Sequence, residues 1–461
     1  MKFTLGIGCA VVAAGVFLAA LMPAVAQDAS GLVPFGATLV KPIERIPGGT
    51  VVLPTSSLPK PAGQARTHLQ FVIPDTPFTP PFNCNVSPTC ETPASLACVY
   101  LLVTQSHGCD PDIVTALSTH GSKVIAIVDA FHNKSALADL QAFSSTFGLP
   151  APHLEILKCT ASSCSTSHPA PPACRNSDQC GWAIEESLDL QAAHAMAPHA
   201  KLILVEALSD SNADLFVAES AAIAAVAAAG GGEVSNSWGG PDFFGETGDD
   251  SIFANSKVAV FASTGDHKNN NDPPWSADVE YPSTSPNVVA VGGTTIIRNS
   301  NHTFEQENSW DNSDGGTGGG LSVNESRPGF QNGIANKVST HRGVPDIAAD
   351  ADPKSGLVIR LSSTCCKVTT GYYPVGGTSL ASPLVAAMTN GAGHFRTSIG
   401  TSSTSQQNTI YGELGVSSKI NDIKTGTCHN GGNPTDGSEV SATVGWDVCT
   451  GVGTPHGLSG L

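Results

Sequence analysis

The sequence predicts an α/β fold with a central, mostly parallel sheet, and two kinds of segment lead to this fold class. Short apolar runs have no polar face and therefore suit strands that are buried on both sides. They lie at 123–129, 201–206, 258–262 and 288–291. Segments with helical composition, at 135–147 and 213–229, alternate with these runs. Strands that alternate with helices are typical of a parallel sheet covered by helices on both faces.

Composition divides the chain into three segments. Residues 1–26 combine a basic start, an apolar run and the small-residue pattern Ala24-Val25-Ala26, an order that predicts a secretory signal peptide. A transmembrane helix at this end is the alternative. Residues 27–91 are rich in Pro, Thr and Gly, and we expect an extended leader or short pro-segment with a strand at Leu69–Ile73. Residues 92–461 carry the alternating pattern as one domain.

The cysteines and the net charge indicate the compartment of the protein and the partners that it does not bind. All but one of the 13 cysteines follow the predicted signal peptide, and in an exported chain they are expected to form disulfides. Zinc is the alternative for Cys159, Cys164, Cys174 and Cys180, although their spacing lacks the short CxxC pairs of zinc sites. The net charge of −17 has the wrong sign for nucleic acid or an anionic membrane surface. We therefore expect a secreted, extracellular monomer without nucleic-acid or membrane partners.

A glycine-rich turn marks a candidate nucleophile. In Gly376-Gly-Thr-Ser379-Leu-Ala-Ser-Pro383, two glycines allow a sharp turn and Pro383 lies near the start of a helix. Ser379 would then lie at a helix N-terminus, where backbone N–H groups can stabilise an oxyanion. Ser382 in the same string is expected to have a packing role.

A serine hydroxyl needs a base. Helical spacing places Glu185 and Asp189 one turn apart on the same face, where each carboxylate shifts the pKa of the other. A solvated acidic face is the alternative interpretation, and Glu186 is the second candidate base. A Ser-His-Asp arrangement with His194 or His199 and Asp129 is a further alternative.

Several strings, in this order along the chain, resemble the sedolisin family of serine-carboxyl peptidases. They are Trp182-Ala-Ile-Glu185-Glu-Ser-Leu-Asp189, Val234-Ser-Asn-Ser-Trp-Gly239, Phe261-Ala-Ser-Thr-Gly-Asp266, Tyr281–Pro286, Gly318–Ser322, Pro345–Pro353 and the Ser379 string. The resemblance implies a subtilisin-like three-layer fold and a secreted endopeptidase that acts at acidic pH on polypeptides through a Ser379 acyl-enzyme. It also implies that the Ser-Asn-Ser-Trp-Gly strand pairs with an extended substrate.

The resemblance assigns roles to four residues. Glu185 is the base, Asp189 orients it, and Asp266 donates a hydrogen bond from its protonated carboxyl to the oxyanion formed when Ser379 attacks. A turn-forming role is the alternative for Asp266. The chain departs from the family in one respect, because sedolisins usually carry a long folded pro-domain and residues 27–91 are short by comparison.

The resemblance also implies one structural calcium ion near the C-terminus. The ligands would be the carboxylates of Asp422 and Asp447 with the carbonyls of Ile423, Thr443 and Gly445, an oxygen-only set that suits Ca²⁺. Cys428 and Cys449 flank this site and are expected to join across it. A catalytically silent, peptide-binding domain is the rival hypothesis for the whole protein.

Overall fold

A computed structural model describes residue 1 and residues 31–266, 279–312, 315–362, 366–393, 402–429 and 439–461. Its central sheet has the strand order β15-β14-β12-β10-β6-β9-β7-β8, with β20 paired to β14. The bounds are β6 Val124–Ala130, β7 His153–Cys159, β8 Cys164–Ser165, β9 Lys201–Ala207, β10 Gly232–Asn236, β12 Val258–Ser263, β14 Val289–Arg298, β15 Phe304–Ser309 and β20 Ile347–Asp350. The interior pairs are parallel, and only β14–β15 and β7–β8 of the described pairs in this sheet are antiparallel. The predicted α/β class is confirmed.

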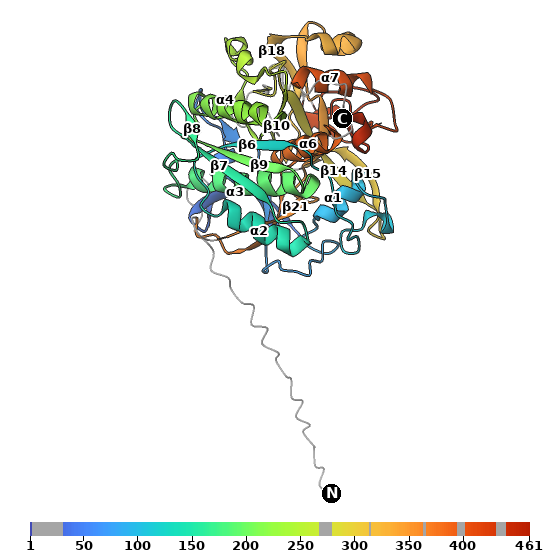
Figure 1. The fold of residues 1–461 in the computed structure, drawn as a ribbon. Helices are drawn as coiled ribbons and strands as arrows, with labels where there is room; N and C mark the ends of the chain where they lie inside the picture. The colour runs from blue at the N-terminus through green and yellow to red at the C-terminus, as the bar shows by residue number, and fades with distance from the viewer. Residues whose placement is uncertain (2–30, 267–278, 313–314, 363–365, 394–401, 430–438) are drawn as a thin grey trace.

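Helices cover both faces of this sheet (Figure 1). On one face, Ile125 and Ile127 of β6 pack into the cluster that contains α3 (Ser177–Met196) and α6 (Thr378–Gly393). On the other, Val124 and Ala126 pack against α4 (Asn212–Ala228). Successive side chains of a strand point to opposite faces, which is why the predicted strands are apolar throughout. α2 (Ala136–Phe147) packs outside α3.

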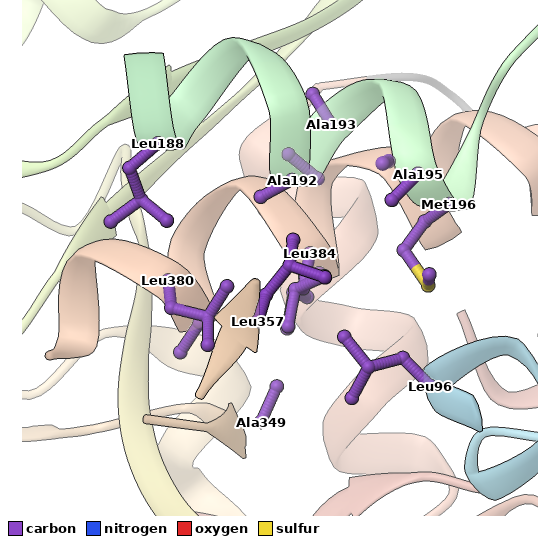
Figure 2. Close-up of a cluster of buried hydrophobic side chains, with 14 of the residues drawn as sticks. Leu96, Leu188, Ala192, Ala193, Ala195, Met196, Ala349, Leu357, Leu380 and Leu384 are labelled. Atoms are coloured by element: carbon purple, nitrogen blue, oxygen red, sulfur yellow. The ribbon is translucent and has the colours of Figure 1, made fainter. Parts of the chain in front are cut away.

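The helices α3 and α6 pack directly on each other, and this contact positions the candidate site. Figure 2 shows Leu188 and Ala192 of α3 facing Leu380 and Leu384 of α6. All four side chains are fully buried. Burial of a leucine side chain stabilises the folded state by roughly 1.5–3 kcal/mol relative to leaving it exposed. These contacts therefore fix the distance between the two helices.

The predicted leader contributes four strands to a second sheet. Its strand order is β1-β2-β3-β5-β22-β21, with bounds β1 Val33–Phe35, β2 Thr38–Ile46, β3 Gly49–Pro54, β5 Gln70–Pro74, β21 Leu357–Leu361 and β22 Gly371–Gly376. The strand expected at Leu69–Ile73 is β5, one residue later. Because β5 pairs with β22, residues 70–71 lie beside the strand that leads to Ser379.

The other predicted elements agree with the structure to within one or two residues at most ends. The helices expected at 135–147 and 213–229 are α2 and α4. The apolar run at 288–291 continues to Arg298, beyond its predicted end, because β14 exchanges its neighbour there and pairs with β15.

Disulfides join several of the cysteines. The described pairs are Cys84–Cys90, Cys98–Cys109, Cys159–Cys164, Cys180–Cys366 and Cys428–Cys449. The last pair confirms the link expected beside the calcium residues. Cys159, Cys164 and Cys180 form disulfides. They are therefore not available as the thiolate ligands that a zinc site would need. Nearly all of the predicted signal peptide lies outside the described residues, and within the described part none of the helices is long and apolar enough to cross a membrane.

Candidate active site

Ser379 is the second residue of α6 and follows a turn that only glycine permits. Gly377 has φ +90°, and a Cβ on it would overlap the carbonyl oxygen of His68. The Ser379 side chain is fully buried. Its Oγ donates to the Ser237 carbonyl over 3.2 Å and accepts from the His68 backbone N–H over 3.1 Å.

Glu185 and Asp189 lie on α3, one turn apart, and both are fully buried. Asp189 Oδ1 accepts a hydrogen bond from Ser237 Oγ over 2.8 Å. Ser237 Oγ also lies 3.2 Å from the carbonyl oxygen of Ser379. The side chain of Ser237 therefore connects the acidic helix α3 to the nucleophile helix α6.

Burial controls the protonation of these carboxyls. Burial, and then the charges of Asp189 and Asp129, raise the pKa of Glu185 well above its ordinary value, while the nearby Ser379 hydroxyl opposes the rise. Burial also raises the pKa of Asp189, while the nearby side chains of Ser237 and Glu185 oppose the rise. The Ser379 hydroxyl is turned toward Ser237, so the Glu185 oxygens have no hydrogen-bond partner of ordinary geometry among the described residues. The solvated acidic face is excluded as an interpretation, because neither carboxyl meets solvent.

Asp266 lies three residues after the end of β12 and faces the start of α6. Its Oδ1 accepts from the Thr378 N–H over 2.7 Å and from Thr378 Oγ1 over 2.9 Å. Its Oδ2 is buried and has no partner among the described residues. Burial raises the pKa of Asp266 to about 8, although the Thr378 contacts oppose the change. A carboxyl with this pKa holds its proton at acidic and neutral pH and can donate from Oδ2.

The other candidate residues lie elsewhere. Burial and then the charges of Glu206 and Asp129 raise the pKa of Glu186, which places this carboxyl with those two groups rather than with Ser379. His194 lies in the last turn of α3, where its Nε2 is 3.0 Å from the Pro150 carbonyl. His199 is exposed. The structure therefore brings together Ser379, Glu185, Asp189 and Asp266, but neither of the two histidines.

Sequence reasoning missed a second group of residues at Ser379. His68 and Arg66 come from the leader, and Ser263 and Glu280 line the same region. The His68 ring lies 2.6 Å from Ser263 Oγ through Nδ1 and 2.5 Å from Glu280 Oε2 through Nε2. Arg66 Nε donates to Glu280 Oε1 over 3.0 Å. Ser263 lies within one of the strings that the sequence analysis singled out and Glu280 directly precedes another, but nothing in the leader's composition indicated His68.

The two carboxylates expected to bind calcium reach the same loop. The Gly445 N–H lies 3.1 Å from both oxygens of Asp422, and the Thr443 N–H donates to Asp447 Oδ2 over 2.7 Å. Lys424 Nζ is 3.6 Å from Asp422 Oδ2. The described part of the chain contains no group of three or more His, Cys, Asp or Glu side chains that could hold a metal. Further ligands would therefore be backbone carbonyls. Two carboxylates that reach one loop, with carbonyl oxygens as the remaining donors, would suit Ca²⁺.

Comparison with known proteins supports the resemblance. The model of the subtilase family matches residues 108–392. Sedolisin of Pseudomonas sp. (strain 101) is 33% identical over 183 residues, which are 38% of this chain and 28% of that protein. Kumamolisin of Bacillus sp. (strain MN-32) is 30% identical over 292 residues, which are 59% of this chain and 49% of that protein. The chain thus spans half or less of the length of these curated relatives.

The fold has a close counterpart among solved structures. The structure of Pseudomonas sedolisin, a serine-carboxyl proteinase complexed with two molecules of pseudo-iodotyrostatin, aligns with a TM-score of 0.62 at 24% identity. The alignment covers 80% of this chain and 95% of that chain. The predicted subtilisin-like three-layer fold is therefore confirmed.

Proposed function

This chain belongs to the subtilase family, and we propose from that premise that it is a serine-carboxyl peptidase of the sedolisin type that hydrolyses polypeptides. One observation carries the proposal. Buried Glu185 and Asp189 on α3 meet Ser379 at the start of α6, with Ser237 hydrogen-bonded to both Asp189 and Ser379. A buried hydroxyl with a carboxylate base and a third group that orients the base is the arrangement of nucleophilic catalysis.

The proposed reaction begins with attack of Ser379 Oγ on the scissile carbonyl. Glu185 accepts the hydroxyl proton and passes it to the leaving amine, and Asp189 holds Glu185 in position. The Ser379 N–H and the protonated Asp266 Oδ2 donate to the oxyanion. Water then attacks the acyl-enzyme ester, and the same groups return to their starting state.

The raised pKa values of the carboxyls at the site support activity at acidic pH. The carboxyls of Glu185, Asp189 and Asp129 influence one another, and burial raises the pKa of each. Ionising all of them together would place several like charges in a desolvated cluster, which is unfavourable. We therefore propose that activity lies on the acid side, with the alkaline limb set by loss of protons from this cluster and from Asp266.

Two further proposals concern the protein as a whole. A calcium ion held by Asp422 and Asp447, with the carbonyls of Ile423, Thr443 and Gly445, would stabilise the C-terminal loops. Secretion follows from the predicted signal peptide and from the disulfides, which persist in oxidising compartments.

The test is hydrolysis of a denatured protein by the purified chain between pH 3 and 7. Ser379→Ala should abolish turnover, and Ser382→Ala is a matched control because Ser382 lies in the same helix with its Oγ 2.9 Å from Ser235 Oγ. Loss of activity in the first variant alone supports the proposal. No hydrolysis by the wild type would favour the silent binding domain, and activity in a folded Ser379→Ala protein would end the assignment of the nucleophile.

A further inference from the structure

An acidic cluster lies at one end of the strand that is expected to receive substrate. That strand is β11 (Trp238–Pro241), and it lies between β4 (Arg66–Thr67) and β13 (Glu280–Tyr281). The loop that follows β11 carries three of the carboxyls, and the fourth is on β18 (Gly320–Ser326). The cluster consists of two hydrogen-bonded pairs, Asp242 with Glu246 and Asp250 with Glu325.

The strands β11 and β18 both lead away from the active site. β11 directly follows Ser237, whose carbonyl accepts a hydrogen bond from Ser379 Oγ over 3.2 Å. Two residues before β18, the Gly318 N–H donates to the Gly265 carbonyl over 2.8 Å, next to the proposed oxyanion donor Asp266. The distance between β11 and β18 therefore affects the width of the site.

Asp242 joins these two strands. Its Oδ2 accepts from Ser322 Oγ over 2.7 Å and from the Val323 N–H over 3.2 Å, both on β18. Its Oδ1 lies 3.1 Å from Thr284 Oγ1. Thr284 is fully buried, and its N–H donates to the carbonyl of Glu280 on β13 over 3.1 Å. One carboxyl thus holds the end of β11 against both β18 and the turn after β13.

The Thr284 hydroxyl indicates that the cluster holds a proton. Glu246 is fully buried, and its Oε1 lies 3.2 Å from the same Thr284 Oγ1. A hydroxyl has one hydrogen and cannot donate to two carboxylates at once. With both carboxyls ionised, one of them would therefore face an oxygen lone pair. A proton on Glu246 removes this conflict, because Glu246 then donates to Asp242.

Glu325 repeats the arrangement on β18. It is 5% exposed, and its Oε1 receives no hydrogen bond from an N–H or hydroxyl group among the described residues. Its partner Asp250 has Oδ1 at 3.4 Å from the Tyr281 hydroxyl. Two carboxyls in contact again need a shared proton, because two like charges at that distance repel each other.

Cations do not neutralise the cluster. Arg342 acts on Glu325, but its Nη1 and Nη2 each donate to Asp346 over 2.6 Å. Across the described residues, acidic side chains are not grouped in a way that could hold a metal ion. The other titratable groups that face the cluster are Asp249 and Tyr281, which add no positive charge. Protons are therefore what neutralises these carboxyls.

We propose that the acidic cluster holds β11 and β18 together only while it keeps its protons, so that it fixes the width of the site at acidic pH and frees the two strands as the pH rises. In the closed form, shared protons replace the repulsion of buried charges. When the cluster opens, the carboxyls meet water and release these protons. The cluster acts on the shape of the site, whereas Glu185 and Asp266 act on the bond that is cleaved.

The opening should depend on pH with a defined slope. Burial, and then contact with Asp242, raise the pKa of Glu246 to about 10. Burial, and then the charges of Asp250 and Asp242, raise the pKa of Glu325 to about 7. A proton that is held in the closed form and lost on opening favours opening by about tenfold for each pH unit above about 4.3. Glu246 should contribute this factor throughout the range from pH 5 to pH 7.

Hydrogen exchange of the full chain measures the opening directly. The N–H groups of Phe243 and Val323 donate to the cluster, so peptides that contain them report on it. After correction for the intrinsic exchange rate, exchange should rise between pH 5 and pH 7 in the wild type. The rise should be about a hundredfold smaller in Glu246→Gln, whose amide N–H replaces the shared proton. Glu305→Gln, the same change at an exposed carboxylate, should behave as the wild type.

A second variant tests the contact at acidic pH. Thr284→Val removes the hydroxyl between Asp242 and Glu246 and should speed exchange already at pH 5, where the cluster is otherwise closed. An equal rise of exchange with pH in the wild type and Glu246→Gln would overturn the proposal. Unchanged exchange at pH 5 in Thr284→Val would overturn it as well.

Kinetics separates the cluster from the catalytic groups, and this measurement rests on the proposed peptidase function. KM for one peptide should rise between pH 5 and pH 7 in the wild type and rise less in Glu246→Gln. The pH profile of kcat should be the same in both, because Glu185 and Asp266 are unchanged. An equal rise of KM in both proteins would contradict the proposal. If the wild type hydrolyses nothing, the proposed function is wrong, and hydrogen exchange still decides whether the cluster opens.

Discussion

The backbone N–H of Ser379 and the carbonyl oxygen of His68 are 3.1 Å apart and form a hydrogen bond. We have proposed that this N–H also stabilises the oxyanion of every substrate. The leader and a foreign polypeptide therefore compete for one position at the start of α6.

The buried carboxyl of Glu219 makes the free energy of unfolding depend on pH. Glu219 on α4 is fully buried, and burial raises its pKa to about 8 while Asn236 opposes the rise. Its proton is held in the folded state but is lost from the unfolded chain above about pH 4.3, so stability falls as pH rises between these two values. By pH 7 the loss is about 3 kcal/mol.

Glu219→Gln carries no titrating proton and should remove this fall. The variant should gain stability relative to the wild type between pH 4 and pH 7, as measured by urea unfolding at both pH values. Glu305→Gln, at an exposed carboxylate, is the control and should show no such gain. Equal pH dependence in wild type and Glu219→Gln would contradict the raised pKa.

Much of this fold could be predicted from sequence because buried parallel strands leave a strong local signal. The run 123–129 differs from β6 by one residue at each end. The second sheet was missed, since β2 is held by its pairing with β3 and β3 by its pairing with β5, and not by any local apolar period. Pairing between residues distant in the chain leaves little trace in composition.

The candidate site was predictable to the extent that it consists of short motifs. Glu185 and Asp189 share a helix, so their spacing alone placed them on one face. His68 could not be found in this way, because the pairings of β4 with β11 and of β5 with β22 bring it to Ser379 from 311 residues away. Burial of Glu185 and Asp189 also needed the structure, since it depends on the packing of α3 against α6.

Removal of calcium should lower thermal stability. An ion that binds only the native state stabilises that state by mass action, by about 2.7 kcal/mol at a hundred times the dissociation constant. A chelator should therefore lower Tm, and Asp422→Ala should lower it to a similar extent and make it insensitive to the chelator. Glu305→Ala serves as a control for loss of an exposed carboxylate. An unchanged Tm in both cases would remove the calcium site.

The last prediction concerns the proton on Asp266. A carboxyl can donate to an oxyanion only in its neutral form, and once ionised it repels the developing charge. Burial raises the pKa of Asp266 to about 8, so the neutral form persists through neutral pH. The contribution of this donor to the rate should then fall as pH rises through about 8, the same direction as the loss expected from the carboxylates on α3.

Asp266→Asn and Asp266→Ala separate these contributions. Asn presents an N–H donor that does not titrate, so it should retain more activity than Ala and shift the alkaline limb upward. Ala removes the donor and should lower kcat by about a hundred- to a thousandfold. Both residues remove the charge, so a difference between them reports the hydrogen bond itself. The measurement is the pH–rate profile of the three proteins on one peptide. If Asp266→Ala matches the wild type, Asp266 only shapes the turn beside Thr378 and the oxyanion is held by Ser379 alone.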